Sequence, residues 1–440
     1  MHFIQGADRQ QVQFISLDDL ITADNSVRIL DAFVDKVDLA QLHFASAVHK
    51  SEGRPPFAPS VLLKLYLYGY INRIRSSRRL QIECVRNIEL QWLLNRLVPN
   101  YHTIANFRRD NAAALKALFK LFVIFLRDQQ LITGELIAVD GSKFRAVNSK
   151  KNNYNQKKID RHLAYIEEKT AAYLQELDSR DEEESKSSSE VTINKNKVQQ
   201  ELQKLKARKE KYHLLEEQLR QSGEEQISTT DADSRGLLLH RNIVEVSYNV
   251  QTAVDAEHNL LIHVEATNRT DRNALHAVVM QAKGMTGKKA ITVLADKGYH
   301  NGRELHQCAQ SSIVTIVPGK AHVDGNSNGP QPAYYVEHFS YDREKDCYTC
   351  PQGNLLTTSG AWHNKTREHS PYRFKKYRTP DCKTCPVKQF CTGRSGGREI
   401  ERSEYQSAVD HNNKRVVHQK ELYLRRQAIV EHPFGTIKRG

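Results

Sequence analysis

Five of the seven cysteines lie in one late stretch of the chain, and four of them form two Cys-x-x-Cys pairs. The pairs are Cys347 with Cys350 and Cys382 with Cys385, and a proline directly follows each pair. Two such pairs predict four thiolates on two tight turns, which is the arrangement of a tetrahedral structural zinc site. An iron-sulfur cluster and unligated thiols are the alternatives to zinc. Three further residues could replace one of the four ligands: Cys391, His363 and His369.

Three acidic residues have the chemistry of a second kind of metal site. Asp140 follows the apolar run LIAV and Asp296 follows ITVLA, so each aspartate is predicted at the tip of a strand. Ligands gather at such strand tips in open α/β sheets, although an aspartate there is also a common turn former. Glu431 falls on a predicted helix near the end of the sequence. Two aspartates and a glutamate offer the hard oxygen ligands that a pair of Mg²⁺ ions needs for phosphoryl transfer.

Basic residues exceed acidic ones by 65 to 52, a formal net charge of +13, which favours a polyanionic partner such as nucleic acid. The stretches INRIRSSRRL and TIANFRRD concentrate arginines, and RFKKYR at 373–378 adds aromatic residues to a basic run. A solvated face is the alternative for each. The candidates for phosphate contact are Arg73, Arg75, Arg78, Arg79, Arg108 and Arg109.

Helical patterns fill the first part of the chain. Pro59 and Ser60 mark the start of one helix, and Thr103 is the predicted N-cap of another that continues to residue 128. Such a basic helical segment could hold a helix-turn-helix, and a plain helical packing domain is the alternative. No apolar run reaches the roughly 18 residues of a membrane span, so we expect a cytoplasmic protein, associated with the nucleoid when bound.

Strand patterns begin after residue 134 and alternate with helical ones. Residues 152–228 interrupt them with two near-heptad stretches separated by the polar run 179–190, which predicts an inserted helical hairpin with a solvated loop. The runs YNVQTAV and LLIHVEA predict a β-hairpin, and Asp271 is interpreted as the cap of the next helix. Further strands at 291–294 and 313–317 complete a mixed sheet flanked by helices.

The motifs AVDGSKFRAVNSK, VSYNVQTAVDAEHNLL, ADKGYHNGREL and IVEHPFGTIKR resemble the transposases of bacterial insertion sequences, the Asp-Asp-Glu group. The resemblance implies an RNase H-like catalytic core with Asp140, Asp296 and Glu431 as catalytic carboxylates and as ligands of two Mg²⁺ or Mn²⁺ ions. It also implies supporting roles for Tyr423, Arg426 and Lys438. Four residues separate Arg426 from Glu431, whereas the family signature has three.

The resemblance implies a particular order of domains along the chain. The expected domains are a helical DNA-binding domain at 1–128, a catalytic core at 129–318 interrupted by the hairpin 152–228, a Cys-rich, zinc-ribbon-like insertion at 319–400, and a catalytic helix at 401–440. Family members continue beyond the FGTIKR motif, so this helix is expected to be truncated. The implied partners are the terminal inverted repeats of the element and target DNA, with a homodimer or larger assembly on them.

Two other classes of function compete with a metal-dependent transposase. A truncated, inactive relative would act only as a sequence-specific DNA-binding protein. A tyrosine recombinase would use Tyr423 as its nucleophile.

Overall fold

Two compact units make up the chain: residues 1–130 with 436–440, and residues 131–435. The structure is a computed structural model that describes residues 10, 12, 14–45, 55–183, 190–239, 243–319, 330–366 and 371–439. His369 and residues 184–189 of the predicted loop 179–190 therefore lie outside the described residues, while the rest of that predicted loop is helical. The domain limits expected from the sequence stay predictions.

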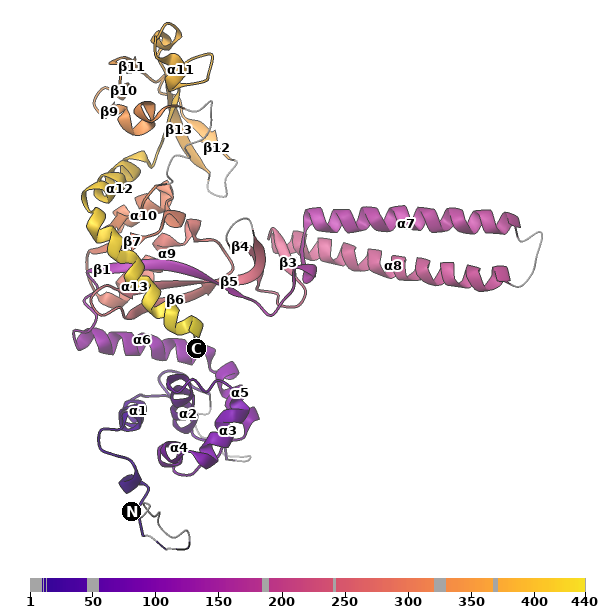
Figure 1. Cartoon of the computed structure of the whole chain (residues 1–440), viewed down its shortest axis with the longest axis vertical. Helices are drawn as coiled ribbons and strands as arrows, with labels where there is room; N and C mark the ends of the chain where they lie inside the picture. Colours follow the sequence, from indigo (N-terminus) through magenta and orange to yellow (C-terminus); the bar gives the residue numbers. More distant parts are fainter. Residues whose placement is uncertain are drawn as a thin grey trace, which may run out of the picture. The chain divides into compact units, whose positions relative to one another are not determined.

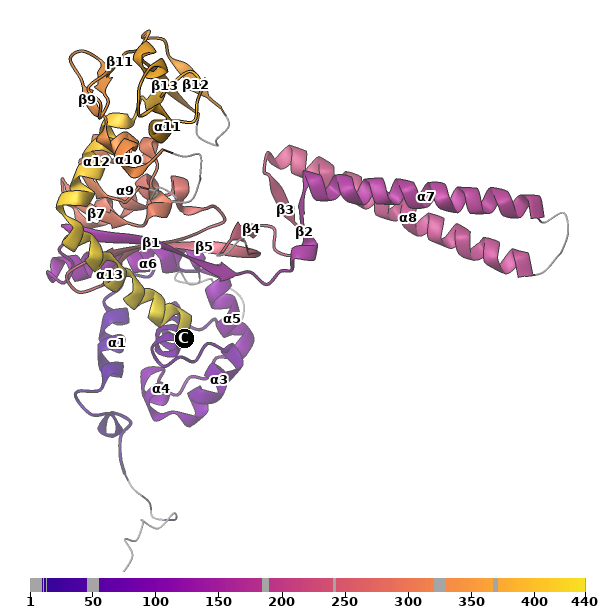
Figure 2. The same cartoon turned by 45° about the horizontal axis from the view of Figure 1, so that its top comes forward.

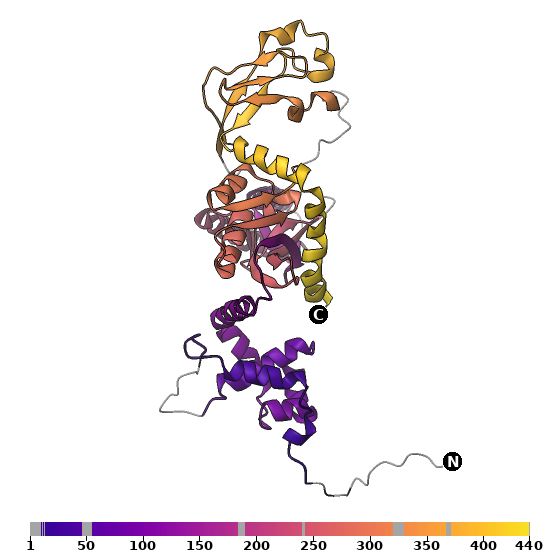
Figure 3. The same cartoon turned by 90° about the vertical axis from the view of Figure 1, so that its left-hand side faces the viewer.

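The described part of the first unit is helical (Figure 3), as its apolar spacing predicts. Pro59 begins α2 as expected, but the helix predicted from 101 to 128 is broken at Asn111 into α5 and α6. The N-cap is Asn100, whose side chain accepts a hydrogen bond from the backbone of Thr103 at 2.9 Å, so the prediction of Thr103 as the cap was wrong. The helices are η1 (Asp18–Leu20), α1 (Ser26–Asp35), α2 (Pro59–Ile71), α3 (Ser77–Arg86), α4 (Ile88–Leu93), α5 (Tyr101–Asp110) and α6 (Ala112–Asp128).

A six-stranded mixed sheet forms the centre of the second unit, which confirms the predicted α/β class. Strand β1 pairs antiparallel with β5 and parallel with β7, and β7 pairs parallel with β8. Both β4 and β6 pair antiparallel with the outer side of β5. The strands are β1 (Leu136–Arg145), β4 (Arg235–Leu238), β5 (Val244–Asp255), β6 (Leu261–Thr267), β7 (Ile291–Ala295) and β8 (Ile313–Ile316).

Helix α13 (Lys420–Arg439) packs on one face of this sheet (Figure 1). Its residues Ile429 and Val430 are 3% and 1% exposed and share a core cluster with Ala138 of β1 and Leu294 of β7. Side chains alternate along a strand, so residues 138 and 140 of β1 face α13, as do residue 294 of β7 and, in the same alternation, Asp296 directly after that strand. Helices α9 (Leu275–Thr286), α10 (Gly302–Gln310) and α12 (Gln406–His418) also contact the sheet or its connections.

Helices α7 (Gln156–Glu183) and α8 (Glu190–Ser222) lie side by side and form the inserted hairpin expected from the sequence (Figure 2). Its core includes Ile159, Ile166, Leu205 and Tyr212, which recur at the predicted near-heptad spacing. A short ribbon of β2 (Asn153–Asn155) and β3 (Gln226–Ser228) closes the base of the hairpin.

Two small sheets make up the cysteine-containing region. The first contains β9 (Ser340–Asp342), β10 (Cys347–Thr349) and β11 (Leu355–Leu356); the second contains β12 (His363–Lys365), β13 (Tyr372–Tyr377) and β14 (Ile400–Ser403). Between β13 and β14 lie the short helices η7 (Pro380–Lys383) and α11 (Lys388–Cys391). None of the helices in the described ranges is long and apolar enough to cross a membrane.

Candidate active site

The two predicted aspartates lie in equivalent positions on neighbouring parallel strands. Val139 of β1 is in register with Ala295, the last residue of β7; Asp140 is the next residue of β1, and Asp296 directly follows β7. The prediction that Asp140 ends its strand was wrong, because β1 continues to Arg145 along its antiparallel partner β5. Asp140 instead marks the point where β1 loses β7 as a neighbour, and there the two carboxylates come together on the face that carries α13.

Asp140 lies in a partly desolvated, acidic environment. Its Oδ1 accepts a hydrogen bond from the backbone N–H of Gly141 at 2.9 Å, and its Oδ2 lies 3.5 Å from Nη1 of Arg426. Burial is the main cause that raises the pKa of the Asp140 carboxyl, and the negative charges of Asp271 and Asp296 add to it. The Arg426 guanidinium and the Gly141 N–H oppose this increase. The raised pKa of Asp140 therefore reflects burial first and the neighbouring carboxylates second.

Asp296 caps the short helix that follows β7. Its Oδ1 accepts a hydrogen bond from the backbone N–H of Lys297 at 2.6 Å, at the start of η4 (Lys297–Tyr299). The side chain of Lys297 itself is exposed. Capping fixes the carboxylate at the strand end, so the turn-forming role of Asp296 and a role in the site are compatible.

A buried polar network lies directly behind Asp140, on the opposite face of the sheet. Asp271 is its centre: Oδ1 accepts hydrogen bonds from the side chains of Asn249 and Gln251, both at 2.7 Å, and Oδ2 lies 3.1 Å from Nζ of Lys143. Burial raises the pKa of this carboxyl, but the hydrogen bonds from the two amides and the charge of Lys143 outweigh it and leave the pKa below its ordinary value. Asp271 is thus held as an anion.

The interpretation of Asp271 as the cap of the next helix was wrong. Helix α9 begins at Leu275 with Ala274 as its N-cap, and the N–H of His276 in its first turn donates to the side chain of Glu304, not of Asp271. Asp271 lies in the preceding turn, η3 (Asp271–Asn273), and its two oxygens bond to side chains of β1 and β5. These partners are far away in the sequence, and for that reason a local pattern suggested a cap instead.

Two further residues connect the network to both strands. Gly141 passes so close to Asp271 that an added Cβ would lie 2.3 Å from Oδ1 of that carboxylate. Tyr299, only 1% exposed, donates a hydrogen bond from its hydroxyl to Oε1 of Gln251 and so ties the segment after β7 to β5. Burial raises the pKa of Tyr299 well above its ordinary value, with the charges of Asp271 and Asp140 adding to the effect, so the hydroxyl stays protonated.

One signal in the sequence could have revealed this network. Residues 247, 249 and 251 of the strand VEVSYNVQTAVD are polar at every second position, and all three are at most 1% exposed. A period of two places them on one face of β5. Buried polar side chains need partners, so this face predicts a polar cluster within the sheet.

Of the residues predicted on helix α13 to support or complete the site, only some lie close to the aspartates. Arg426 is paired with Asp140, and its guanidinium carbon lies 6.0 Å from the ring centre of the partly buried Tyr423. Glu431 is exposed and accepts a hydrogen bond from Gln427, also on α13, at 2.7 Å. Lys438 lies in the end of α13 that belongs to the first unit. Among the described residues no three His, Cys, Asp and Glu side chains are close enough to hold a metal ion as they stand.

The four-residue gap between Arg426 and Glu431 explains why the glutamate lies apart. Successive residues of an α-helix are rotated by about 100°, so a gap of three residues leaves two side chains about 40° apart and a gap of four about 140° apart. With Arg426 facing the sheet, the position on the same side of the helix is Val430, which is 1% exposed. Glu431 consequently faces away from the sheet.

The oxygen ligands of the site suit a divalent metal ion. Asp140 and Asp296 come from adjacent strands and face the same side, and carboxylate oxygens are the ligands that Mg²⁺ and Mn²⁺ prefer. Burial raises the pKa of the Asp140 carboxyl most, and the charges of Asp271 and Asp296 add to the increase, so a bound cation would favour the ionised form of Asp140. The described arrangement brings these two carboxylates together, and the metal-binding roles of Asp140, Asp296 and Glu431 stay predictions.

Two of the predicted DNA-contacting arginines line one shallow pocket in the first unit. Arg75, just before α3, and Arg108, on α5, border a cavity of about 60 Å³ together with Tyr66 and Tyr70 of α2. A hydrogen bond with the hydroxyl of Tyr70 raises the pKa of Arg108. The remaining candidates lie nearby on or before these helices: Arg73, Arg78, Arg79 and Arg109.

These remaining arginines differ in how they are engaged. Arg78 stacks 5.0 Å from the ring centre of Tyr101, and Arg109 contacts Asp110 at 2.8 Å. Arg73 is exposed, and Nε of the exposed Arg79 lies 4.0 Å from the carboxylate of Glu83. The structure therefore distinguishes Arg75 and Arg108, which share a pocket, from Arg79 and Arg109, which are paired with carboxylates.

The basic run 373–378 is neutralised by neighbouring acids. Arg373 pairs with Glu404 at 3.1 Å, and Lys375 pairs with Asp346 at 2.7 Å. Lys376 and Arg378 both contact Glu399. These ion pairs weaken the hypothesis that the run contacts phosphates.

The cysteines are arranged differently from the predicted pair of turns. Cys382 and Cys385 lie on a turn as expected, but Cys347 belongs to strand β10 and Cys350 follows that strand. Four cysteines line one small cavity, and Cys391 takes the place expected for Cys347 among them. The alternative ligand His363 is exposed on β12.

Comparison with known proteins gives two matches to family models. Residues 15–110 match a model described as Transposase domain (DUF772), and residues 349–440 match one described as Transposase DDE domain. No curated protein and no solved structure gives a significant match. The second match includes the cysteines of the cavity and α13, while Asp140 and Asp296 lie between the two matched regions.

Proposed function

We propose a function for this chain from the premise that it belongs to the insertion-sequence transposases of the Asp-Asp-Glu type. As a transposase it acts on DNA. We infer that it cleaves phosphodiester bonds at the ends of its element in a metal-dependent reaction and joins those ends to target DNA. The observation that carries this proposal is the register of β1 and β7, which places Asp140 and Asp296 at the same point of neighbouring strands.

The proposed catalytic core is RNase H-like. A meander of three antiparallel strands, β1, β5 and β6, is followed by β7 and β8, which extend the sheet parallel to β1. This arrangement supports the proposal because it brings the first and second aspartates, 156 positions apart, onto adjacent strands.

Asp140 and Asp296 would hold the divalent metal ions, with Glu431 as the proposed third ligand. A bound metal pair would activate the attacking oxygen and stabilise the leaving oxygen of the phosphodiester. The chain's own residues prepare this site: the Gly141 N–H fixes one oxygen of Asp140, and Arg426 orients the other. Arg426 also leaves a positive charge beside the carboxylates, where a DNA phosphate would approach.

Arg75 and Arg108 would contact the element's terminal repeats in the proposed function, with the other candidate arginines around them. Because two element ends must be cut and joined, we propose a homodimer or a larger assembly on DNA. The zinc expected from the cysteine pairs would have a structural role, since four thiolates leave no coordination position for chemistry.

Incubation of the purified chain with end-labelled DNA carrying the element ends tests the proposal. Nicking should require Mg²⁺ or Mn²⁺ and should be lost in Asp296→Ala, whereas Tyr423→Phe should retain it because Tyr423 packs against the core cluster beneath α13. The opposite pattern, metal-independent cleavage lost in Tyr423→Phe, would establish a tyrosine recombinase instead. Specific DNA binding without any nicking would leave only the DNA-binding alternative.

A further inference from the structure

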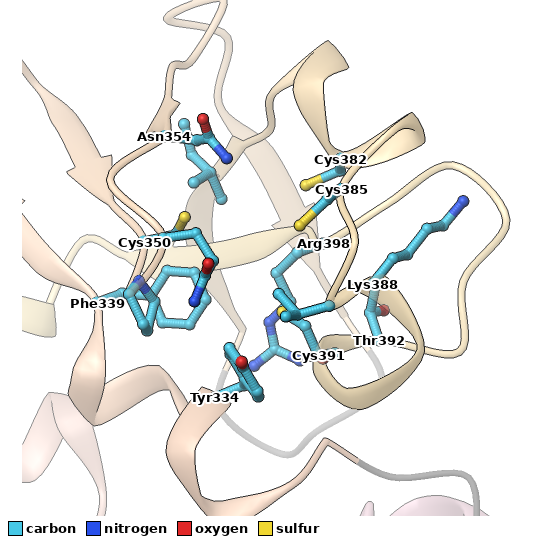
Figure 4. A pocket seen from close by; sticks show the side chains of 14 residues that line it. Tyr334, Phe339, Cys350, Asn354, Cys382, Cys385, Lys388, Cys391, Thr392 and Arg398 are labelled. Carbon is cyan, nitrogen blue, oxygen red and sulfur yellow. Dashed lines mark hydrogen bonds between the residues drawn. The ribbon is translucent and has the colours of Figure 1, made fainter.

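A small cavity in the cysteine-containing region is bordered by four of the chain's seven cysteines (Figure 4). The cavity has a volume of about 20 Å³, enough for a single water molecule or ion. Figure 4 shows the side chains of Cys382 and Cys385 leaving the same turn in the same direction. The four cysteines are Cys350, Cys382, Cys385 and Cys391.

Local backbone geometry explains why Cys350 borders the cavity and Cys347 does not. Alternate residues of an extended strand face opposite sides, so Cys347 and Cys350, three positions apart, point in opposite directions. Cys350 is on the same side as Tyr348 and packs with it in the small core of this region. Cys347 faces away and is only 3% exposed.

The other three cysteines come from one compact segment. Cys382 is in η7, Cys385 follows it, and the backbone carbonyl of Cys385 accepts a hydrogen bond from Lys388, the first residue of α11. Cys391 ends α11 and packs against the same small core as Cys350. Gly397 (φ +94°) presses on this segment so closely that an added Cβ would lie 2.4 Å from Cβ of Cys382.

Positive charge accompanies the sulfurs. Arg398 and Lys388 both border the cavity, but Nζ of Lys388 donates a hydrogen bond to the backbone carbonyl of Ser395 at 2.8 Å. Nη1 of Arg398 donates to the backbone carbonyl of Cys391 at 3.4 Å, while its Nε is buried without a hydrogen-bond partner. The same guanidinium lies 5.7 Å from the ring centre of Phe339. The unsatisfied Nε favours an acceptor or a negative charge close to it. Zinc with four thiolates carries a net charge of −2, which satisfies this requirement.

We propose that Cys350, Cys382, Cys385 and Cys391 bind one structural zinc ion and that Cys347 is not a ligand. Binding deprotonates the four thiols, and the released protons pass to solvent. In the described residues no three of these sulfurs are within reach of one ion, so the cysteine side chains must rotate to bring each sulfur to about 2.3 Å from it. Arg398 then offsets the charge of the thiolates from behind them, as outer residues commonly do at such sites.

The metal content of the purified full-length chain tests this assignment without any measurement of activity. Elemental analysis should find about one zinc per chain, since a four-thiolate site takes one ion. Cys391→Ser and Cys350→Ser should lose most of the zinc, whereas the matched variant Cys347→Ala, which changes the buried cysteine beside the site, should retain it. Loss of zinc in Cys347→Ala with retention in Cys391→Ser would overturn the ligand set.

A second measurement guards against variants that fail to fold. Cobalt(II) added to chelator-treated wild-type chain should give the intense thiolate charge-transfer absorption of a tetrahedral four-sulfur site, and the Cys347→Ala chain should give the same intensity. An absorption that weakens in Cys347→Ala, a chain purified without bound metal that takes up no cobalt, or iron with acid-labile sulfide in place of zinc would each contradict the proposal.

Discussion

At the scale of single residues, Asp271 has the most unexpected position. It accepts hydrogen bonds from two amides, is paired with Lys143, and lies against the backbone of Gly141 directly behind Asp140. It is a positioning residue, because its oxygens are occupied by protein donors on the face away from α13. Its contribution is to hold the strand that carries Asp140.

Asp271→Asn should therefore reduce nicking by about 10- to 100-fold, the usual effect of removing a residue that orients a metal ligand. The asparagine side chain has the volume of the aspartate but lacks the negative charge that pairs with Lys143. Its NH₂ group would also face the NH₂ groups of Asn249 and Gln251, which donate to Asp271 in the native chain. A purely structural role predicts the same loss at every metal concentration. A positioning role predicts partial rescue at high Mn²⁺, measured as nicking rate against metal concentration, and Asp160→Asn on the exposed hairpin helix is the control.

Arg426 should set the pH dependence of the reaction. Asp140 has a raised pKa, so its ionised form is lost at a higher pH than for an ordinary aspartate as the solution is acidified. The charge of Arg426 opposes that rise. Arg426→Gln should shift the acidic limb of the pH-rate profile to higher pH, while Arg426→Lys should shift it less; an unchanged limb in both variants would show that Asp140 does not titrate in the reaction.

At the scale of elements, the sequence predicts strands better than it predicts what lies between them. The runs before Asp140 and Asp296 are local; Asp140 lies on the strand that its run forms, and Asp296 directly follows its strand. Asp271 was misinterpreted because its partners at 143, 249 and 251 are brought to it only by sheet pairing. Likewise, Cys-x-x-Cys spacing is the same on a strand and on a turn, but only the turn at 382–385 lets both sulfurs face one side.

Helix α13 offers a sharp test at this scale, because it carries a glutamate that faces away from the aspartates. If Glu431 is the third carboxylate, Glu431→Gln should abolish nicking. In that case α13 must rotate or shift when DNA and metal bind, so that Glu431 reaches the aspartates. Glu421→Gln, an equally exposed glutamate in the first turn of α13, should have little effect. Equal, near-wild-type rates for both variants would limit the acidic site to the two strand aspartates.

At the scale of the whole molecule, the net charge of +13 favours DNA binding, but the distribution of the charge decides where DNA binds. The basic run 373–378 is paired with acids, whereas Arg75 and Arg108 share a pocket in the unit that matches the Transposase domain (DUF772). The formal charge alone does not separate these two regions, since ion pairing depends on tertiary contacts.

Arg108 and Arg109 are neighbours in sequence and allow a matched comparison. Arg108→Ala should weaken binding to element ends and reduce the slope of log K against log salt by about 1, the effect of losing one phosphate contact. Arg109→Ala should change both quantities less, because Arg109 is already paired with Asp110 at 2.8 Å. Fluorescence anisotropy across a salt series measures both effects, and equal losses would show that the Asp110 pair opens on DNA.

Because position 141 has no side chain, the carboxylate of Asp271 can lie against the backbone of β1, so the residue types at positions 141 and 271 depend on each other. An alanine there would occupy the space of the Asp271 carboxylate, and shortening or removing Asp271 would leave Lys143 and two buried amides without their shared acceptor. Positions 141 and 271 are therefore expected to covary among relatives. A chain that gains a side chain at the first position should have lost the acid at the second, together with its lysine.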